Sequence, residues 1–201
     1  MPAWNGWYHL MANTYGTWAA GDGRGFRTRH HREHIEGDYK HPPPAGKYEA
    51  RLQQSRTLMK RDSVLLNPAA RVAAVDAIVA AMQFHEIELL VVSVSATHLH
   101  LLGRFPASVK KKPTVLDRGL RTSALDDPPR HYLGIAKKES AKALVVDGLV
   151  DSGGVWAKRG KVKPIQDRAH EVRVYGYVVA HLEEGAAVWC HRWNQVRMRE
   201  I

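Results

Sequence analysis

The strongest constraint on the fold is an apolar run followed at once by a stretch of alternating polar and apolar residues. The apolar run, residues 89–94, has the composition of a buried strand. Residues 97–102 read THLHLL, so the two histidines stand two positions apart. Because side chains alternate across a strand, His98 and His100 are expected on one face while the leucines enter the layer behind.

A histidine pair of this kind allows two interpretations: two half-buried polar residues, or two ligands of one metal ion. A second segment favours the metal site. Asp167 is a helix-capping residue before a helix that we expect to run to about residue 184. This helix carries Tyr177 and, one turn later, His181, and residues four apart share a helix face. The sequence therefore predicts a three-histidine metal site with a tyrosine beside it.

Tyr175 competes with Tyr177 for the same role. The two residues are separated by about 200° around a helix, so both cannot face one site. Only Tyr177 has a ligand-capable residue four positions later, at His181.

The other segments predict an α+β architecture. Asn67 and Pro68 form a helix-start signal before an alanine-rich stretch with apolar residues at helical spacing. The expected order is a strand at 7–15, a helix at 69–84, a hairpin at 88–105 turning near Ser95 and Ala96, a helix at 132–146, a basic strand or hairpin at 155–165, and the helix that carries Tyr177. The simplest arrangement is a ferredoxin-like or RRM-like antiparallel sheet with helices on one face and the C-terminal helix appended.

Polar and proline-rich stretches suggest insertions within a single domain, residues 1–201. We expect surface insertions near 19–60 and 106–130 and a basic C-terminal tail. The first insertion holds a basic cluster with His30, His31 and His34, which has no ordered ligand spacing and is typical of a solvated loop. The second holds three consecutive lysines at 110–112.

The charge balance favours a polyanionic partner, most commonly nucleic acid, although a basic surface can also serve solubility alone. The chain has 30 Lys and Arg against 20 Asp and Glu, a net charge of +10. Candidate phosphate contacts are Lys137, Lys138, Lys142, Lys158, Arg159, Lys161 and Lys163. Tryptophans 156, 189 and 193 are either core residues or stacking platforms for bases.

Cysteine content and hydropathy predict a soluble, cytoplasmic protein. The single Cys190 excludes an internal disulfide and multi-cysteine zinc sites. No signal segment and no apolar run of membrane-spanning length is evident, so we expect no membrane association.

Several motifs together resemble the single-tyrosine HUH transposases of small insertion sequences and the REP-associated tyrosine transposases. They are WYHLMANTYGTW with GDGRG after it, THLHLL, GLVDSGGVWAKRG and YGYVVAHLEEG, and the resemblance spans nearly the whole chain. Two positions differ from the family pattern. Thr97 stands where Asn or Asp is common before the histidine pair, and His181 stands where Gln or Asn often supplies the third ligand.

The resemblance implies that His98 and His100 bind a divalent metal, Mg²⁺ or Mn²⁺, and that Tyr177 is the nucleophile. It also implies cleavage and rejoining of single-stranded or hairpin-flanked DNA through a 5′-phosphotyrosine. Such a reaction needs no ATP, and the chain has no phosphate-binding loop of the GxxxxGK[ST] kind. A homodimer is compatible with this activity, and the site could be assembled in one chain or across two.

Two other functions remain open at this point. The chain could be a decayed or domesticated relative that binds nucleic-acid hairpins without cutting them, which the two departures allow. A phosphoesterase with two His-x-Thr/Ser motifs is a further alternative, but only one histidine pair is present.

Overall fold

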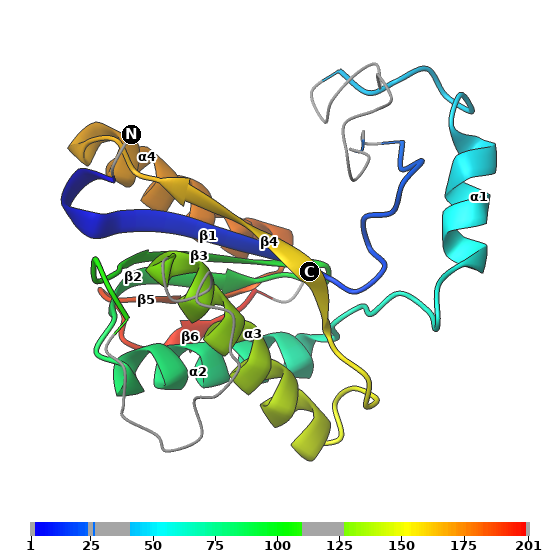
Figure 1. Ribbon diagram of the computed structural model, residues 1–201. Coiled ribbons are helices and arrows are strands. Elements are labelled where there is room, and N and C mark those ends of the chain that lie inside the picture. Colours follow the sequence, from blue (N-terminus) through cyan, green and yellow to red (C-terminus); the bar gives the residue numbers. More distant parts are fainter. Residues whose placement is uncertain (1–2, 24–25, 27–40, 110–126, 200–201) are drawn as a thin grey trace, which may run out of the picture.

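The computed structural model describes residues 3–23, 26, 41–109 and 127–199 (Figure 1). The basic cluster with His30, His31 and His34 and the lysines at 110–112 lie outside this part of the chain. The helices and strands, in chain order, are η1 (Trp4–Gly6), β1 (Trp7–Thr14), α1 (Glu49–Thr57), α2 (Pro68–Phe84), β2 (Glu88–Val94), β3 (His98–Arg104), α3 (Pro128–Val146), β4 (Trp156–Pro164), α4 (Arg168–Ala180), η3 (His181–Glu184), β5 (Ala187–Cys190) and β6 (Val196–Arg197).

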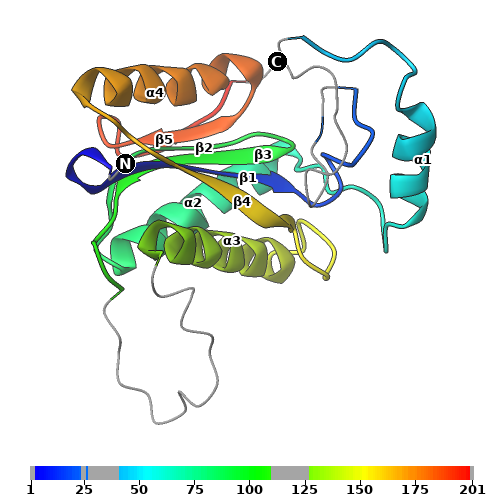
Figure 2. The same cartoon turned by 45° about the horizontal axis from the view of Figure 1, so that its top comes forward.

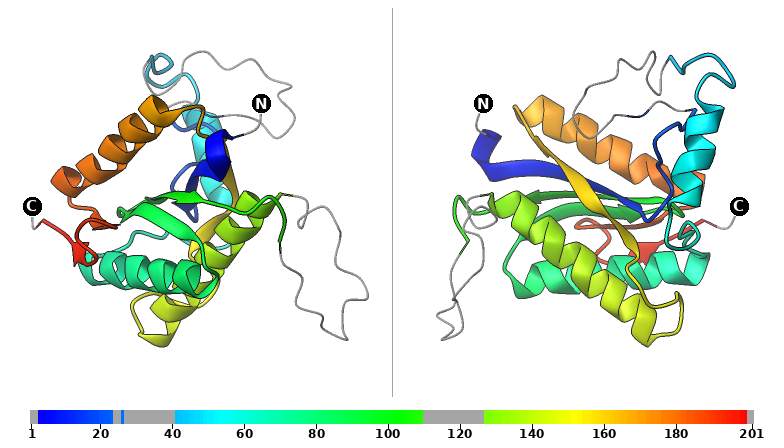
Figure 3. Two further views of the ribbon diagram at one scale, coloured as in Figure 1. Left: turned by 90° about the vertical axis from the view of Figure 1, so that its left-hand side faces the viewer. Right: turned by 45° about the vertical axis from the view of Figure 1, so that its right-hand side comes forward.

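One antiparallel sheet organises these elements, with the strand order β4-β1-β3-β2-β5-β6. The first four strands and the helices α2 and α3 make the βαββαβ unit of a ferredoxin-like fold. Helices α2 and α3 cover one face of the sheet, and α4 lies across the other (Figure 2). The predicted α+β, ferredoxin-like class is confirmed, and the appended helix covers the face that α2 and α3 leave open (Figure 3).

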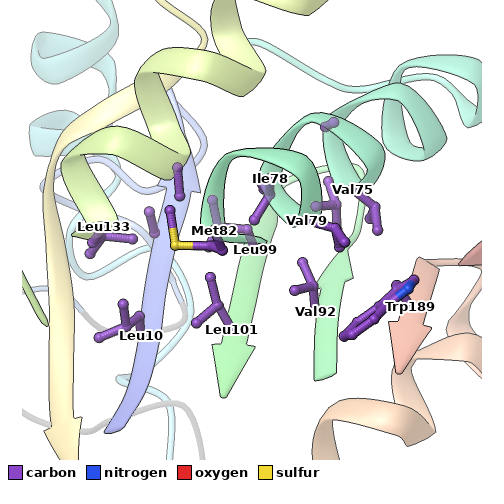
Figure 4. Close-up of a cluster of buried hydrophobic side chains, with 14 of the residues drawn as sticks. Leu10, Val75, Ile78, Val79, Met82, Val92, Leu99, Leu101, Leu133 and Trp189 are labelled. Carbon is purple, nitrogen blue, oxygen red and sulfur yellow. The ribbon is translucent and has the colours of Figure 1, made fainter. Parts of the chain in front are cut away.

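The main core lies between the sheet and α2 and α3. Side chains at alternating strand positions, among them Leu10, Val92, Leu99 and Leu101, meet the apolar stripe of α2 (Figure 4). Asn67 caps α2, because its side chain accepts a hydrogen bond of 2.8 Å from the backbone nitrogen of Ala70. The predicted helix, its cap and its core-facing stripe are therefore all present.

Helix α3 begins earlier than its apolar pattern predicts. Asp127 caps it, accepting a hydrogen bond from the backbone nitrogen of Arg130, and Pro128 and Pro129 occupy its first turn. Proline fits there because the first backbone N–H groups of a helix have no intrahelical partner. The Asp-Pro-Pro sequence was therefore a helix-start signal at the end of the predicted insertion.

The C-terminal segment is not only a basic tail. Residues 187–190 read AVWC, are all buried, and form β5, which pairs with β2. Four apolar residues suffice for a buried strand because neighbouring strands and helices cover both of its faces. Within the expected insertion near 19–60, residues 49–57 form α1, which buries none of its residues.

Among the described residues, no helix has both the length and the apolar character that a bilayer span requires.

A substitution at Leu101 tests how much the core packing contributes to stability. It is fully buried, whereas Leu58 is 76% exposed. We expect Leu101→Ala to lower the free energy of unfolding by about 3 kcal/mol, because it leaves a cavity at the centre of the sheet. The matched control is Leu58→Ala, which should change stability little because Leu58 is exposed. Urea unfolding of the two variants measures the difference. Equal stability of the two variants would contradict the packing described.

Candidate metal centre and tyrosine

Strand β3 places its histidines on the face of the sheet that α4 covers. Leu99 and Leu101 point into the core with α2, so His98 and His100 point the other way. The strand lies between β1 and β2, and this central position holds the histidine backbone in two hydrogen-bonded ladders.

Helix α4 brings the third histidine and the tyrosine to this face. Asp167 caps the helix as predicted, accepting a hydrogen bond of 2.6 Å from the backbone nitrogen of His170. The α-helix ends at Ala180, and His181 opens a 3₁₀ turn rather than a further α-helical turn. Its backbone angles remain helical, so His181 and Tyr177 still share one side of the helix.

The three predicted metal ligands lie together. One potential ligand atom from each of His98, His100 and His181 lies within 4.8 Å of the other two. His100 and His181 are buried, with exposed fractions of 7% and 5%, and His98 is partly buried. The three histidines are thus close enough to hold a metal ion.

His181 and His98 each have an oxygen partner at Nδ1. In His181, Nδ1 lies 3.0 Å from the carbonyl oxygen of Tyr177, which can only accept, so this nitrogen carries the hydrogen. In His98, Nδ1 lies 2.9 Å from Oγ of Ser95 and 3.1 Å from Oγ1 of Thr97. Thr97, which differs from the family pattern, thus supplies a hydroxyl partner. Partners of this kind orient histidine ligands that bind a metal through the other nitrogen.

The electrostatic environment keeps the central imidazoles neutral. Burial, together with three neighbouring histidines, lowers the pKa of His100 to about 2. Burial, followed by the positive charge of Lys163, lowers the pKa of His9 to about 4. Neutral imidazole is the form that binds metals, and a set of three nitrogen donors suits divalent transition ions such as Mn²⁺, Co²⁺ and Ni²⁺ better than Mg²⁺. The donor set therefore fits a divalent ion and, of the two ions that the resemblance implies, favours Mn²⁺ over Mg²⁺.

Tyr177 borders the histidine cluster, and Tyr175 does not. The ring centroid of Tyr177 lies 4.7 Å from that of His181 and 5.5 Å from that of His100, and the residue is 54% exposed. Tyr175 packs near His191, and burial followed by its hydrogen bond to Cys190 raises its pKa to about 12. Only Tyr177 combines contact with the cluster and access to a large substrate.

His9 on β1 also belongs to this cluster, although sequence reasoning did not single it out. Its Nε2 lies 2.8 Å from Nδ1 of His100, and the two rings meet edge to edge with centroids 5.0 Å apart. The sequence offered one weak signal for this role: His9 lies in the first strand, next to Leu10, so it faces away from the core. Its proximity to His100 depends on the pairing of β1 with β3.

The basic candidates lie on both sides of the sheet. Lys161 and Lys163 pair with Met11 and His9 in the β1–β4 ladder, so they share the face of the histidines. Lys158 and Arg159 are exposed on the same strand. The α3 lysines lie on the opposite face: Lys137 donates to the carbonyl oxygens of Ala157 and Lys158, Lys138 pairs with Glu139, and Lys142 lines a groove between α2 and α3.

Two of the three tryptophans considered as stacking platforms are core residues. Trp156 is buried, and its Nε1 donates a hydrogen bond of 2.9 Å to Oγ of Ser140. Trp189 is buried in β5. Trp193 is partly buried, with the guanidinium carbon of Arg197 4.4 Å from its ring centroid. Base stacking by Trp156 and Trp189 would require the core to open.

The comparison with protein-family models found no match, and neither did the comparisons with curated proteins and with solved structures. The family resemblance therefore rests on the sequence motifs and stays a prediction.

If the histidine cluster is the metal site, replacing its histidines should abolish metal binding and replacing other histidines should not. Replacing both His98 and His100 by alanine should abolish Mn²⁺ binding in calorimetric titration, because His181 alone cannot hold the ion. The matched control replaces His85 and His191, two histidines outside the cluster, and should bind as the wild type does. Tight binding by the His98→Ala, His100→Ala variant would place the metal elsewhere.

Proposed function

We propose that this protein is a metal-dependent enzyme that cuts and rejoins single-stranded DNA through a covalent tyrosyl intermediate. The observation that carries the proposal is the contact of the exposed Tyr177 ring with His100 and His181, two of the three histidines that can hold one metal ion. A tyrosine nucleophile beside a metal held by the histidine pair is the arrangement that the resemblance to single-tyrosine HUH transposases implies, and His181 adds a third possible ligand where the family often has Gln or Asn.

The reaction follows from these groups. The hydroxyl oxygen of Tyr177 attacks the scissile phosphorus and loses its proton, the bond from phosphorus to the 3′ oxygen breaks, and the departing oxygen gains a proton. The bound metal would supply Lewis-acid stabilisation of the charge on the phosphate oxygens. The three histidines would hold the metal, and α4 holds the ring of Tyr177 against His100 and His181.

Rejoining needs no external energy source. The phosphotyrosine ester retains the energy of the broken phosphodiester, so a 3′-hydroxyl of the same or another strand can attack it and release Tyr177. The family resemblance implies that the phosphate linked to tyrosine is the 5′ phosphate.

The positive charge beside the site supports a polyanionic substrate. Lys161 and Lys163 line the histidine face along the edge strand β4. The Nζ of Lys161 also lies 5.6 Å from the ring centroid of Trp18, which is 41% exposed. A single DNA strand that crosses this edge would place its phosphates beside the ammonium groups of Lys161 and Lys163. It could reach Tyr177 with no base pairs to open.

Tyr177 is tested by trapping the adduct. Tyr177→Phe should retain the fold, metal binding and DNA binding but form no covalent adduct with labelled single-stranded DNA in Mn²⁺, because only the attacking hydroxyl is lost. Tyr175→Phe is the matched control and should form the adduct. Mass spectrometry of the trapped peptide locates the nucleotide, and an adduct on any other residue would refute the assignment.

The same assay separates catalysis from binding alone. If the wild type binds metal and hairpin DNA but yields no adduct with any flanking sequence of its own gene, the protein is a binding relative that no longer cuts DNA.

If DNA passes along β4 beside Lys161 and Lys163, the salt dependence of its affinity should change when these lysines are replaced and not when lysines on the other face are replaced. The logarithm of affinity should fall with the logarithm of salt concentration by about 0.7 for each phosphate contacted on a single strand. Lys161→Ala with Lys163→Ala should lower this slope by roughly 1 to 2. The matched pair Lys138→Ala with Lys142→Ala lies on the other face and should leave it unchanged. Fluorescence anisotropy at several salt concentrations measures both, and equal effects of the two pairs would argue against the path.

A further inference from the structure

The buried pair of His9 and His100 has only one hydrogen to share between its facing nitrogens. Nε2 of His9 lies 2.8 Å from Nδ1 of His100, and both residues are buried. In a neutral pair one nitrogen must donate and the other accept. The direction of this hydrogen bond therefore decides which nitrogen of His100 carries hydrogen.

Only one direction is compatible with metal binding by His100. If Nδ1 of His100 donates to His9, its Nε2 has no hydrogen and its lone pair can coordinate. If His9 donates instead, the hydrogen of His100 is on Nε2, where it blocks coordination. His181 is already fixed in the coordinating form, because its Nδ1 donates to the carbonyl oxygen of Tyr177.

We propose that His9 is a positioning residue that accepts the hydrogen bond from His100 and so holds His100 ready to coordinate metal through Nε2. The proposal rests on the metal site of the proposed function, but it does not depend on DNA cleavage. The ring centroids lie 5.0 Å apart and the ring planes differ by 27°, so the rings meet edge to edge, which is the geometry of an in-plane N–H···N hydrogen bond. His9 would act on the metal only through His100.

Two substitutions separate an acceptor from a space-filling residue. His9→Leu fills the position with an apolar side chain and removes the nitrogen that accepts the hydrogen bond. It should weaken Mn²⁺ binding by roughly 10- to 100-fold in calorimetry. His9→Gln places an amide oxygen near the position of Nε2 and should bind more nearly as the wild type does. Met11→Leu is the control for packing, because Met11 is the residue of β1 that pairs with His100 in the ladder.

A spectroscopic measurement on the unsubstituted, metal-free protein tests the tautomer directly. Long-range ¹H–¹⁵N correlation spectra should show hydrogen on Nδ1 of His100 and none on its Nε2. This measurement decides the proposal even if His9→Leu does not fold, since hydrogen on Nε2 of His100 would overturn it.

The outcomes also distinguish this proposal from the proposed function. A folded His9→Leu protein with the metal affinity of the wild type would overturn the role of His9 alone. Loss of metal affinity in His9→Leu, with recovery in His9→Gln, supports that role even if no DNA adduct forms. Failure of the wild type to bind Mn²⁺ would overturn both proposals.

Discussion

The pairing of β3 with β1 sets the positions of both the core leucines and the histidine cluster. This ladder sets Met11 opposite His100 and brings His9 within hydrogen-bond distance of it, while the leucines of β3 enter the core on the other side. Because side chains alternate, a slip of one residue would move the histidines into the core and the leucines toward α4. The burial of Leu99 and Leu101 thus stabilises the register that brings the candidate metal ligands together.

Helix α4 completes the site by dividing its residues between burial and access. Val178 packs against the sheet and His181 is buried, whereas Tyr177, which shares one side of the helix with His181, is 54% exposed. Packing of the apolar residues therefore holds the tyrosine at the margin of the histidine cluster. The attack on one phosphate of a long strand that we propose for Tyr177 needs this combination of a fixed backbone and an exposed side chain.

Features encoded by local patterns could be predicted from the sequence, whereas most contacts between distant segments could not. The exception is the meeting of His181 with the histidines of β3, which was predicted from the residue types and which the structure confirms. The capped helix α2, the β2–β3 hairpin and the grouping of Tyr177 with His181 follow from spacing within a few turns or residues. The contact of His9 with His100 joins residues 91 positions apart, so no local pattern contains it. Strand β5 was missed because four apolar residues carry little periodicity, and the position of Lys137 depends on how α3 packs against β4.

We expect one metal ion to bind beside Tyr177. Anomalous diffraction from crystals grown with Mn²⁺ tests this directly. One peak should lie at about 2 Å from a nitrogen of each of His98, His100 and His181, with the ring of Tyr177 next to it. A cluster without a peak in crystals that bind Mn²⁺ at other histidines would contradict it.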